Sequence, residues 1–161
     1  MNPPGAGSAH ANVRFPPPLL FVGAFFIGWL LHRALPIPLL GAGITAVRLI
    51  IGWLAVALGF TTTMSGIITF RRAGTTVIPH HPVSRVVTHG PYRFTRNPMY
   101  LGLTIAYIGG ILLMNDLWPA VLLPVALLLL IHFVIEREER YLSAAFGAEY
   151  DEYRRRVRRW I

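Results

Sequence analysis

Four apolar stretches follow one another along this chain, and they decide what it can fold into. A helix that crosses a bilayer needs about 20 mostly apolar residues. Of the 161 residues, 54% are apolar and only 14% are charged, so the chain has too little polar surface to dissolve as one globule. We therefore predict an all-α integral membrane protein with about four transmembrane helices. The expected helices are Leu19–Leu31, Val47–Phe70, Met99–Met114 and Leu117–Val134.

The N-terminal residues 1–18 differ in composition from the rest. They contain five prolines and almost no charge, which is typical of a flexible tail. Arg14 precedes the first apolar stretch, so a signal peptide has to be considered. The sequence His32-Arg33-Ala34-Leu35 offers no small-x-small cleavage site, and we predict a retained helix instead. Residues 19–161 are then one membrane-embedded domain.

Small residues recur on two of the expected helices. They come every seven residues in the second stretch and every four in the third, which indicates close helix packing. The pair Asn115-Asp116 predicts a turn, so that the third and fourth stretches form a tight hairpin. Pro124 is expected to kink the fourth helix. The small residues are Gly52, Gly59, Gly66, Gly102, Ala106 and Gly110.

The positive charge consists entirely of arginine. Fifteen arginines and seven acidic residues give a net charge of +8. A basic chain can bind nucleic acid or anionic lipid, and the apolar background favours membrane lipid. We expect neither a nucleic-acid partner nor an obligate protein partner. Arginines gather before the hairpin and after it, so the positive-inside rule places both segments and the C-terminus in the cytoplasm.

A long polar loop, residues 71–97, precedes the third stretch. It holds three histidines, of which His80 and His81 are adjacent and therefore poorly placed to bind one metal ion. The loop contains no acidic residue and the chain contains no cysteine. We predict no metal site. His132 in the fourth stretch remains either a ligand or base, or a hydrogen-bonded packing residue.

The segment after the fourth stretch is expected to form amphipathic helices at the membrane surface. On a helical wheel, Ile135, Leu142 and Phe146 share a narrow apolar stripe. Glu138 and Glu139 border that stripe, and a carboxylate held against an apolar face needs a partner, which is Arg93, Arg96 or a cationic ligand. A last helix from about residue 149 to the end of the chain carries aromatic residues on one side and arginines elsewhere.

Two motifs flank the hairpin in a recognisable order. Gly90-Pro91-Tyr92-Arg93 is followed by Arg96-Asn97-Pro98-Met99-Tyr100-Leu101-Gly102, and Glu138-Glu139 is followed by Leu142, Phe146-Gly147, Glu149-Tyr150 and Tyr153. This arrangement resembles the isoprenylcysteine carboxyl methyltransferase family and its phospholipid methyltransferase relatives. The resemblance covers roughly residues 74–160. Asn97 stands where many members of that family have a histidine.

The resemblance implies a membrane enzyme that binds S-adenosylmethionine at the cytoplasmic face and methylates a lipophilic or amphiphilic acceptor. It places the cofactor site between residues 74–102 and 132–160. Arg93, Arg96 and Glu139 are the implied catalytic residues. The implied cofactor-binding residues are Val87, His89, Gly90, Pro91, Tyr92, Asn97, Pro98, Tyr100, Gly102, Glu138 and Glu139.

Two other functions fit parts of the sequence. A membrane reductase of the sterol-reductase type, dependent on NAD(P)H, has a broadly similar turn before a hairpin, but its phosphates favour arginines over paired glutamates. A non-enzymatic lipid-binding module would use only the basic C-terminal region. The acceptor also stays open, because a carboxylate needs no general base, whereas an amine or thiol would need one such as Glu139 or His89.

Overall fold

The computed structural model describes residues 16–41, 44–74 and 85–161, and within these ranges all regular structure is helical. Three helices are long and apolar enough to span a membrane, and α3 is an apolar helix of 17 residues. The predicted all-α membrane fold is confirmed. The helices are α1 (Pro17–Ala34), α2 (Thr45–Arg72), η2 (Gly90–Arg93), α3 (Pro98–Met114), α4 (Leu117–Leu130), η3 (Ile131–Ile135), α5 (Glu136–Phe146) and α6 (Ala148–Arg156).

The boundaries differ from expectation at both ends of the chain. The first helix begins at Pro17, inside the segment expected to be a tail, because proline at the first helical position supplies a suitable φ angle. Residues 1–15, which hold the rest of that predicted tail, lie outside the described residues. The last helix was expected to continue to the end of the chain, but α6 ends at Arg156. Residues 157–161 are not helical.

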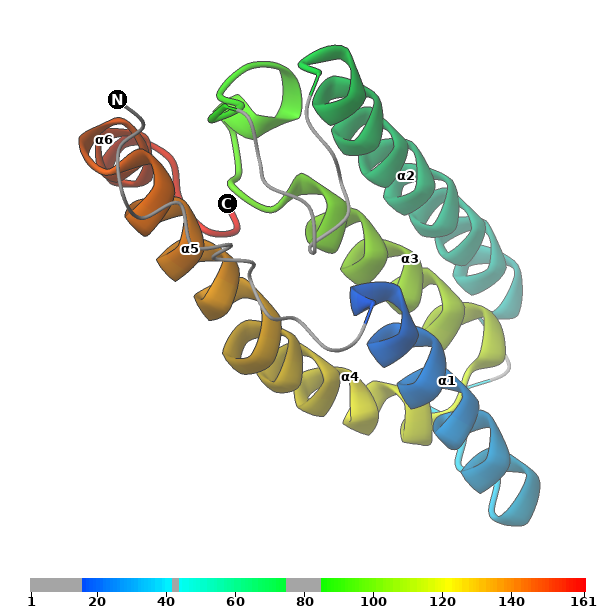
Figure 1. Ribbon diagram of the computed structural model, residues 1–161. Helices are drawn as coiled ribbons and strands as arrows, with labels where there is room; N and C mark the ends of the chain where they lie inside the picture. Colours follow the sequence, from blue (N-terminus) through cyan, green and yellow to red (C-terminus); the bar gives the residue numbers. More distant parts are fainter. Residues whose placement is uncertain (1–15, 42–43, 75–84) are drawn as a thin grey trace, which may run out of the picture.

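The most extensive contact between helices joins α2 and α3, which lie side by side (Figure 1). Gly52, Gly59 and Gly66 of α2 are buried in this contact. A Cβ atom at Gly59 would lie 2.4 Å from the backbone nitrogen of Ala106, so only glycine allows the two backbones to approach this closely. The predicted stripe of small residues is confirmed. On α3, however, Gly109 faces α2, whereas Gly110 faces Phe25 of α1.

The turn between α3 and α4 is as short as expected, but the two helices then diverge (Figure 1). Asn115 adopts a left-handed conformation with φ of 54°, and Asp116 caps the N-terminus of α4. Beyond the turn α3 packs along α2, and α4 packs along α1. The apolar core contains residues from α1, α3, α4 and η3, namely Phe21, Tyr107, Ile111, Leu130, Val134 and Ile135.

The helices α4, η3 and α5 form one continuous helix of 30 residues. At 1.5 Å per residue it is about 45 Å long, whereas the hydrocarbon core of a bilayer is about 30 Å thick. Its C-terminal part therefore extends beyond the apolar layer, and that part carries the charged residues of α5. Pro124 lies within α4. The turn η3 is π-helical, which is uncommon and is often associated with functional sites.

At the end of the bundle far from α5 and α6, Asp116 contacts α1, the segment between α1 and α2, and α4. Its buried carboxylate lies 2.7 Å from Nδ1 of His32 and accepts hydrogen bonds from the backbone N–H groups of Ile37 (2.9 Å) and Trp118 (3.0 Å). Burial by itself would raise the pKa of Asp116, but these hydrogen bonds outweigh it and the pKa lies below its ordinary value.

We expect Asp116→Ala to lower the free energy of unfolding by about 3 kcal/mol, because it removes a helix cap and two further bonds to a charged group. Thermal unfolding in detergent measures this, with Glu152→Ala as control because that side chain forms only a surface pair with Arg156. Since the folded-state pKa of Asp116 is lowered, its contribution is complete above its ordinary pKa and disappears as the pH falls through the lowered pKa. Equal melting temperatures at neutral pH would contradict this prediction.

Candidate functional site

The turn η2 is shaped by Gly90 and Pro91. Gly90 has a φ of +62°, a conformation that favours glycine, and a Cβ atom there would lie 3.0 Å from Oγ1 of Thr69 in α2. Pro91 occupies the first turn of η2. The result is that Tyr92 points inward, with 4% of its surface exposed and its ring centroid 5.1 Å from that of Phe70.

The start of α3 is joined to α5 by one hydrogen bond. Pro98 is buried at the first position of α3, and Tyr100 follows within the same turn. The hydroxyl of Tyr100 donates to Oε1 of Glu138 at 2.8 Å. The helices α3 and α4 diverge from their shared turn (Figure 1). This bond therefore connects the start of α3 to α5, the continuation of α4, far from that turn. Glu138 is thus held by a neutral donor, and no cationic side chain pairs with it among the contacts of the described residues.

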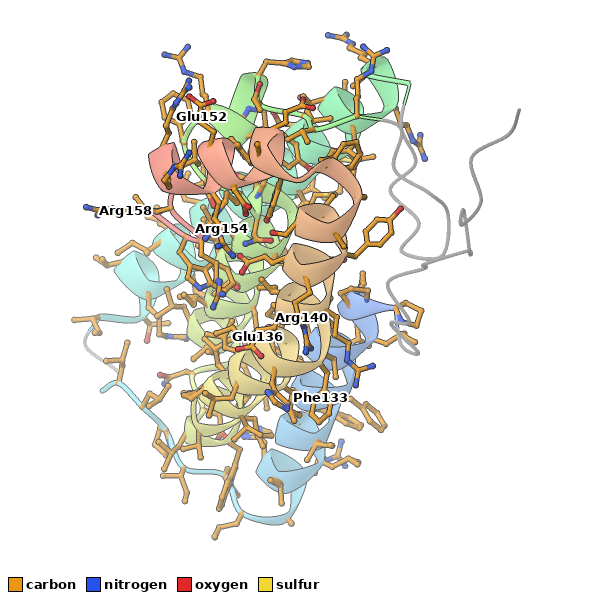
Figure 2. All side chains as sticks on the ribbon, turned by 60° about the vertical axis from the view of Figure 1, so that its left-hand side comes forward. Phe133, Glu136, Arg140, Glu152, Arg154 and Arg158 are labelled. Carbon is orange, nitrogen blue, oxygen red and sulfur yellow. The ribbon has the colours of Figure 1, made fainter. Side chains whose placement is uncertain are left out.

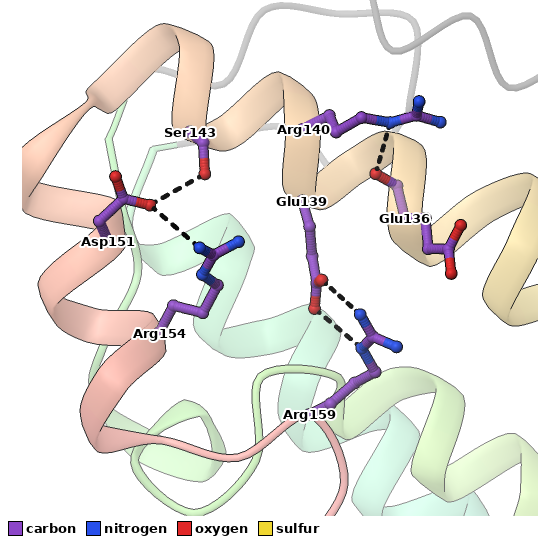
Figure 3. Close-up of a pocket in the computed structure, with 7 residues that line it drawn as sticks. All are labelled: Glu136, Glu139, Arg140, Ser143, Asp151, Arg154 and Arg159. Atoms are coloured by element: carbon purple, nitrogen blue, oxygen red, sulfur yellow. Dashed lines mark hydrogen bonds and ion pairs between the residues drawn. The ribbon is translucent and has the colours of Figure 1, made fainter.

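Glu139 lies in a different electrostatic environment from its neighbour. Only 9% of it is exposed, and Nη1 of Arg96 lies 3.0 Å from its Oε1. Arg159 donates to both carboxylate oxygens, from Nε at 3.1 Å and from Nη2 at 2.7 Å (Figure 3). These hydrogen bonds raise the pKa of Arg159. Two guanidinium groups around one carboxylate leave an excess positive charge at Arg96 and Arg159.

Three buried donor atoms at this site have no hydrogen-bond partner among the described residues. They are the hydroxyl of Tyr92 and two nitrogens of Arg96, Nε and Nη1, of which Nη1 lies within ion-pair distance of Glu139. Burial raises the pKa of Tyr92, and the nearby groups of Tyr153 and Glu138 raise it further, so the hydroxyl stays protonated. Buried polar groups are normally paired, and an unpaired donor marks a place where a partner fits.

A cavity of about 550 Å³ opens on the face formed by α5 and α6 (Figure 3). The pair Glu139 and Arg159 forms part of its wall, and Asp151 on α6 accepts from Ser143 at 3.1 Å and lies 3.8 Å from Arg154. Of the residues implied by the sequence, only Glu139 lines this cavity. Its lining residues are Glu136, Glu139, Arg140, Ser143, Asp151, Arg154 and Arg159.

The sequence model of the phospholipid methyltransferase family matches residues 47–149. The chain belongs to this family. The matched region includes α2, in which the sequence alone offered no recognisable motif, as well as the hairpin and the paired glutamates. The resemblance to the isoprenylcysteine carboxyl methyltransferase and phospholipid methyltransferase group is confirmed.

Several proteins resemble this phospholipid methyltransferase family member in sequence. A probable protein-S-isoprenylcysteine O-methyltransferase from Oryza sativa subsp. indica is 30% identical over 109 residues, which cover 66% of this chain and 57% of that protein. The protein-S-isoprenylcysteine O-methyltransferase of Schizosaccharomyces pombe is 33% identical over 72 residues, 45% of this chain and 30% of that protein. An uncharacterized protein from Haemophilus influenzae is 42% identical over 65 residues, 39% of this chain and 100% of that protein.

This chain spans only about half the length of the rice relative, which it covers over 57%. No solved structure matches it significantly.

The structure brings some of the residues implied by the family resemblance together and leaves others apart. Tyr92, Arg96, Tyr100, Glu138 and Glu139 lie at the junction of η2, α3 and α5. Val87 packs beside Tyr92, and the side-chain amide of Asn97 donates to the carbonyl of Arg159 at 3.0 Å.

Three implied residues lie in other surroundings. Arg93 is exposed, with its guanidinium group 4.9 Å from the ring centroid of Phe94. His89 is exposed and contributes its carbonyl to the N–H of Tyr92 at 3.3 Å. Gly102 is buried against Thr63 and Gly59 of α2, where its place is in helix packing. His80 and His81 lie outside the described residues.

Sequence reasoning missed Thr95 and Arg159. Thr95 is 4% exposed and its hydroxyl donates to the carbonyl of Arg159 at 3.0 Å. Arg159 belongs to a run of arginines that includes the exposed Arg154 and Arg158 on the outer surface of the same region (Figure 2). Within such a run, nothing in residue type or spacing distinguishes the side chain that pairs with Glu139.

Proposed function

We propose that this protein is an S-adenosylmethionine-dependent methyltransferase of the membrane, acting on a lipophilic or amphiphilic acceptor. One observation carries the proposal: two unlike charge environments lie side by side. Glu138 is an acidic side chain held by the neutral hydroxyl of Tyr100, and a cationic ligand beside it would favour its negatively charged form. Next to it, Arg96, Glu139 and Arg159 together carry an excess positive charge.

The chemistry of the donors fits the cofactor. S-adenosylmethionine carries a reactive methyl group on a positively charged sulfur, together with an ammonium and a carboxylate group. In the proposed arrangement Glu138 faces the cationic groups, and Arg96 donates its free Nε to the carboxylate. The hydroxyl of Tyr92 supplies a further donor. These residues bind, align the methyl group with the acceptor and exclude water from the reacting atoms.

The charge pattern argues against a reductase that binds a nicotinamide dinucleotide. The phosphates of such a cofactor require several arginines free of acidic partners. Arg96 and Arg159 share Glu139, and Glu138 would repel a phosphate placed beside Tyr100. A lipid-binding module without a cofactor has no use for buried, unpaired donors at the junction of η2, α3 and α5.

We propose that the acceptor enters from the lipid, where exposed apolar residues cover α1 and α2. The site lies at the end of the bundle where the arginines of η2, α5 and α6 gather, and on the positive-inside rule we propose that it faces the cytoplasm. The relatives from rice and fission yeast are named for an isoprenylcysteine O-methyl transfer. An acceptor carboxylate would be nucleophilic without a general base, which suits a site whose Glu139 is neutralised by arginines.

Calorimetric titration of the detergent-purified protein tests the function. We expect S-adenosylhomocysteine to bind with a dissociation constant in the micromolar range, typical of enzyme ligands, and NADPH not to bind. Binding of NADPH alone would support the reductase, and binding of neither would leave only the lipid-binding module. A labelled-methyl assay with lipid extracts and prenylated cysteine analogues then identifies the acceptor.

A further inference from the structure

Residues 157–161, here called the C-terminal segment, leave α6 without regular secondary structure and run beside the start of α3. The change of conformation occurs at Val157, with φ of −117° and ψ of 129°. Backbone groups of the segment are bound by three consecutive residues. The N–H of Arg96 donates to the carbonyl of Arg158 at 3.0 Å, and Thr95 and Asn97 both donate to the carbonyl of Arg159 at 3.0 Å.

Side chains hold the C-terminal segment from its other side. Trp160 packs against the apolar core formed by residues such as Leu130 and Ile135. Arg159 donates to both carboxylate oxygens of Glu139, and Arg96 approaches the same carboxylate. The segment is therefore fixed at its carbonyl groups and at an ion pair near the junction of η2, α3 and α5, and at an apolar side chain on the adjoining core.

We propose that Arg159 is a positioning residue of the methyl-transfer site, which acts by fixing the carboxylate of Glu139 and thereby the guanidinium group of Arg96. The inference rests on the proposed function and adds to it a residue from the C-terminal segment. Of the two carboxylate oxygens of Glu139, Arg96 approaches Oε1 through Nη1, and its side chain also hydrogen-bonds Tyr150. Arg159 occupies both oxygens, so the carboxylate cannot rotate, and Arg96 keeps Nε free for a ligand.

The opposite role, in which Arg159 blocks the site until it is displaced, disagrees with the contacts. Displacing the segment would break three hydrogen bonds to Thr95, Arg96 and Asn97 and expose Trp160. Such a contact network is typical of a permanent wall of a site. The two roles predict opposite effects of removing the side chain.

Titration with S-adenosylhomocysteine tests the proposal on the full chain. We expect Arg159→Ala to weaken binding about 10- to 100-fold, which corresponds to the loss of a charge-assisted contact. Arg159→Lys should recover only part of the affinity, because a lysine cannot bind both oxygens in a fork. Millimolar guanidinium added to Arg159→Ala should restore binding in part. The control is Arg155→Ala, which removes the same charge from an exposed position on α6 and should bind like the parent.

The outcomes distinguish the positioning role of Arg159 from the proposed function. Equal binding by the parent and Arg159→Ala would overturn the positioning role alone, and tighter binding by Arg159→Ala would show a blocking role instead. Failure of the parent to bind would overturn the proposed function. A lower melting temperature of Arg159→Ala without a change in affinity, and without rescue by guanidinium, would reduce Arg159 to a structural residue.

Discussion

We expect Gly59→Ala to lower the free energy of unfolding by about 3 kcal/mol, near the upper end of the cost of overpacking. The added Cβ would lie 2.4 Å from the nitrogen of Ala106 and 2.5 Å from the carbonyl oxygen of Gly102. Both are backbone atoms, so neither can move aside without moving α3 as a whole. The change therefore separates α2 from α3 along the most extensive contact of the fold.

Thermal unfolding in detergent measures this effect, and Gly23→Ala is its matched control. Gly23 also lies inside an apolar helix, but no atom lies within 4 Å of a Cβ built there. Both exchanges gain about 1 kcal/mol of helix propensity, so only the contact with α3 distinguishes them. A Gly59→Ala variant as stable as Gly23→Ala would mean that α2 and α3 do not depend on this close approach.

The second large effect is expected when the carboxylate of Glu138 is replaced by an amide. Glu138→Gln should reduce kcat/KM for methyl transfer about 100-fold, because a charge-assisted contact to a cationic ligand in a buried site contributes about 3 kcal/mol. The amide keeps the size of the side chain and can still accept the hydrogen bond from Tyr100. The loss would therefore report the charge and not the shape of the site.

Comparing the affinities for two ligands shows which cationic group of the cofactor lies beside Glu138. S-adenosylmethionine and S-adenosylhomocysteine differ in one methyl group and in the positive charge on sulfur. If Glu138 faces the sulfonium, Glu138→Gln weakens the first ligand much more than the second, and equal weakening would place the ammonium there instead. Glu149→Gln, which removes an exposed carboxylate of α6, should leave both affinities unchanged. Unaltered binding of both ligands by Glu138→Gln would exclude the residue from the site.

The periodicity of the sequence was enough to find the helices and the buried face of α5. The wheel on Ile135, Leu142 and Phe146 placed Glu138 and Glu139 beside an apolar stripe, and Glu139 is indeed buried. The spacing of glycines was enough to find the contact between α2 and α3. These features depend on residues within one or two turns of a helix, where sequence spacing and spatial position correspond.

The partners of the two glutamates could be predicted only in part, because the sequence offered Arg96 as a candidate but not Tyr100 or Arg159. Glu138 and Glu139 are alike in type, yet one meets a tyrosine and the other two arginines. Arg159 reaches Glu139 because Thr95, Arg96 and Asn97 capture the carbonyls of the C-terminal segment, and that capture also ends α6 at Arg156. Contacts between residues 20 to 64 positions apart leave no local pattern in the sequence.

The π-helical turn η3 determines the direction in which the later side chains of the long helix point. A π-turn accommodates about one residue more than an α-helical turn, and one residue corresponds to a rotation of about 100°. Closing η3 into an ordinary α-turn would swing Glu138 and Glu139 away from Tyr100 and Arg96 without changing either residue. The orientation of the acidic pair therefore depends on Ile131–Ile135: an α-turn with the same number of residues would rotate the pair out of the site, whereas deleting one residue as the turn closes would keep the pair in place.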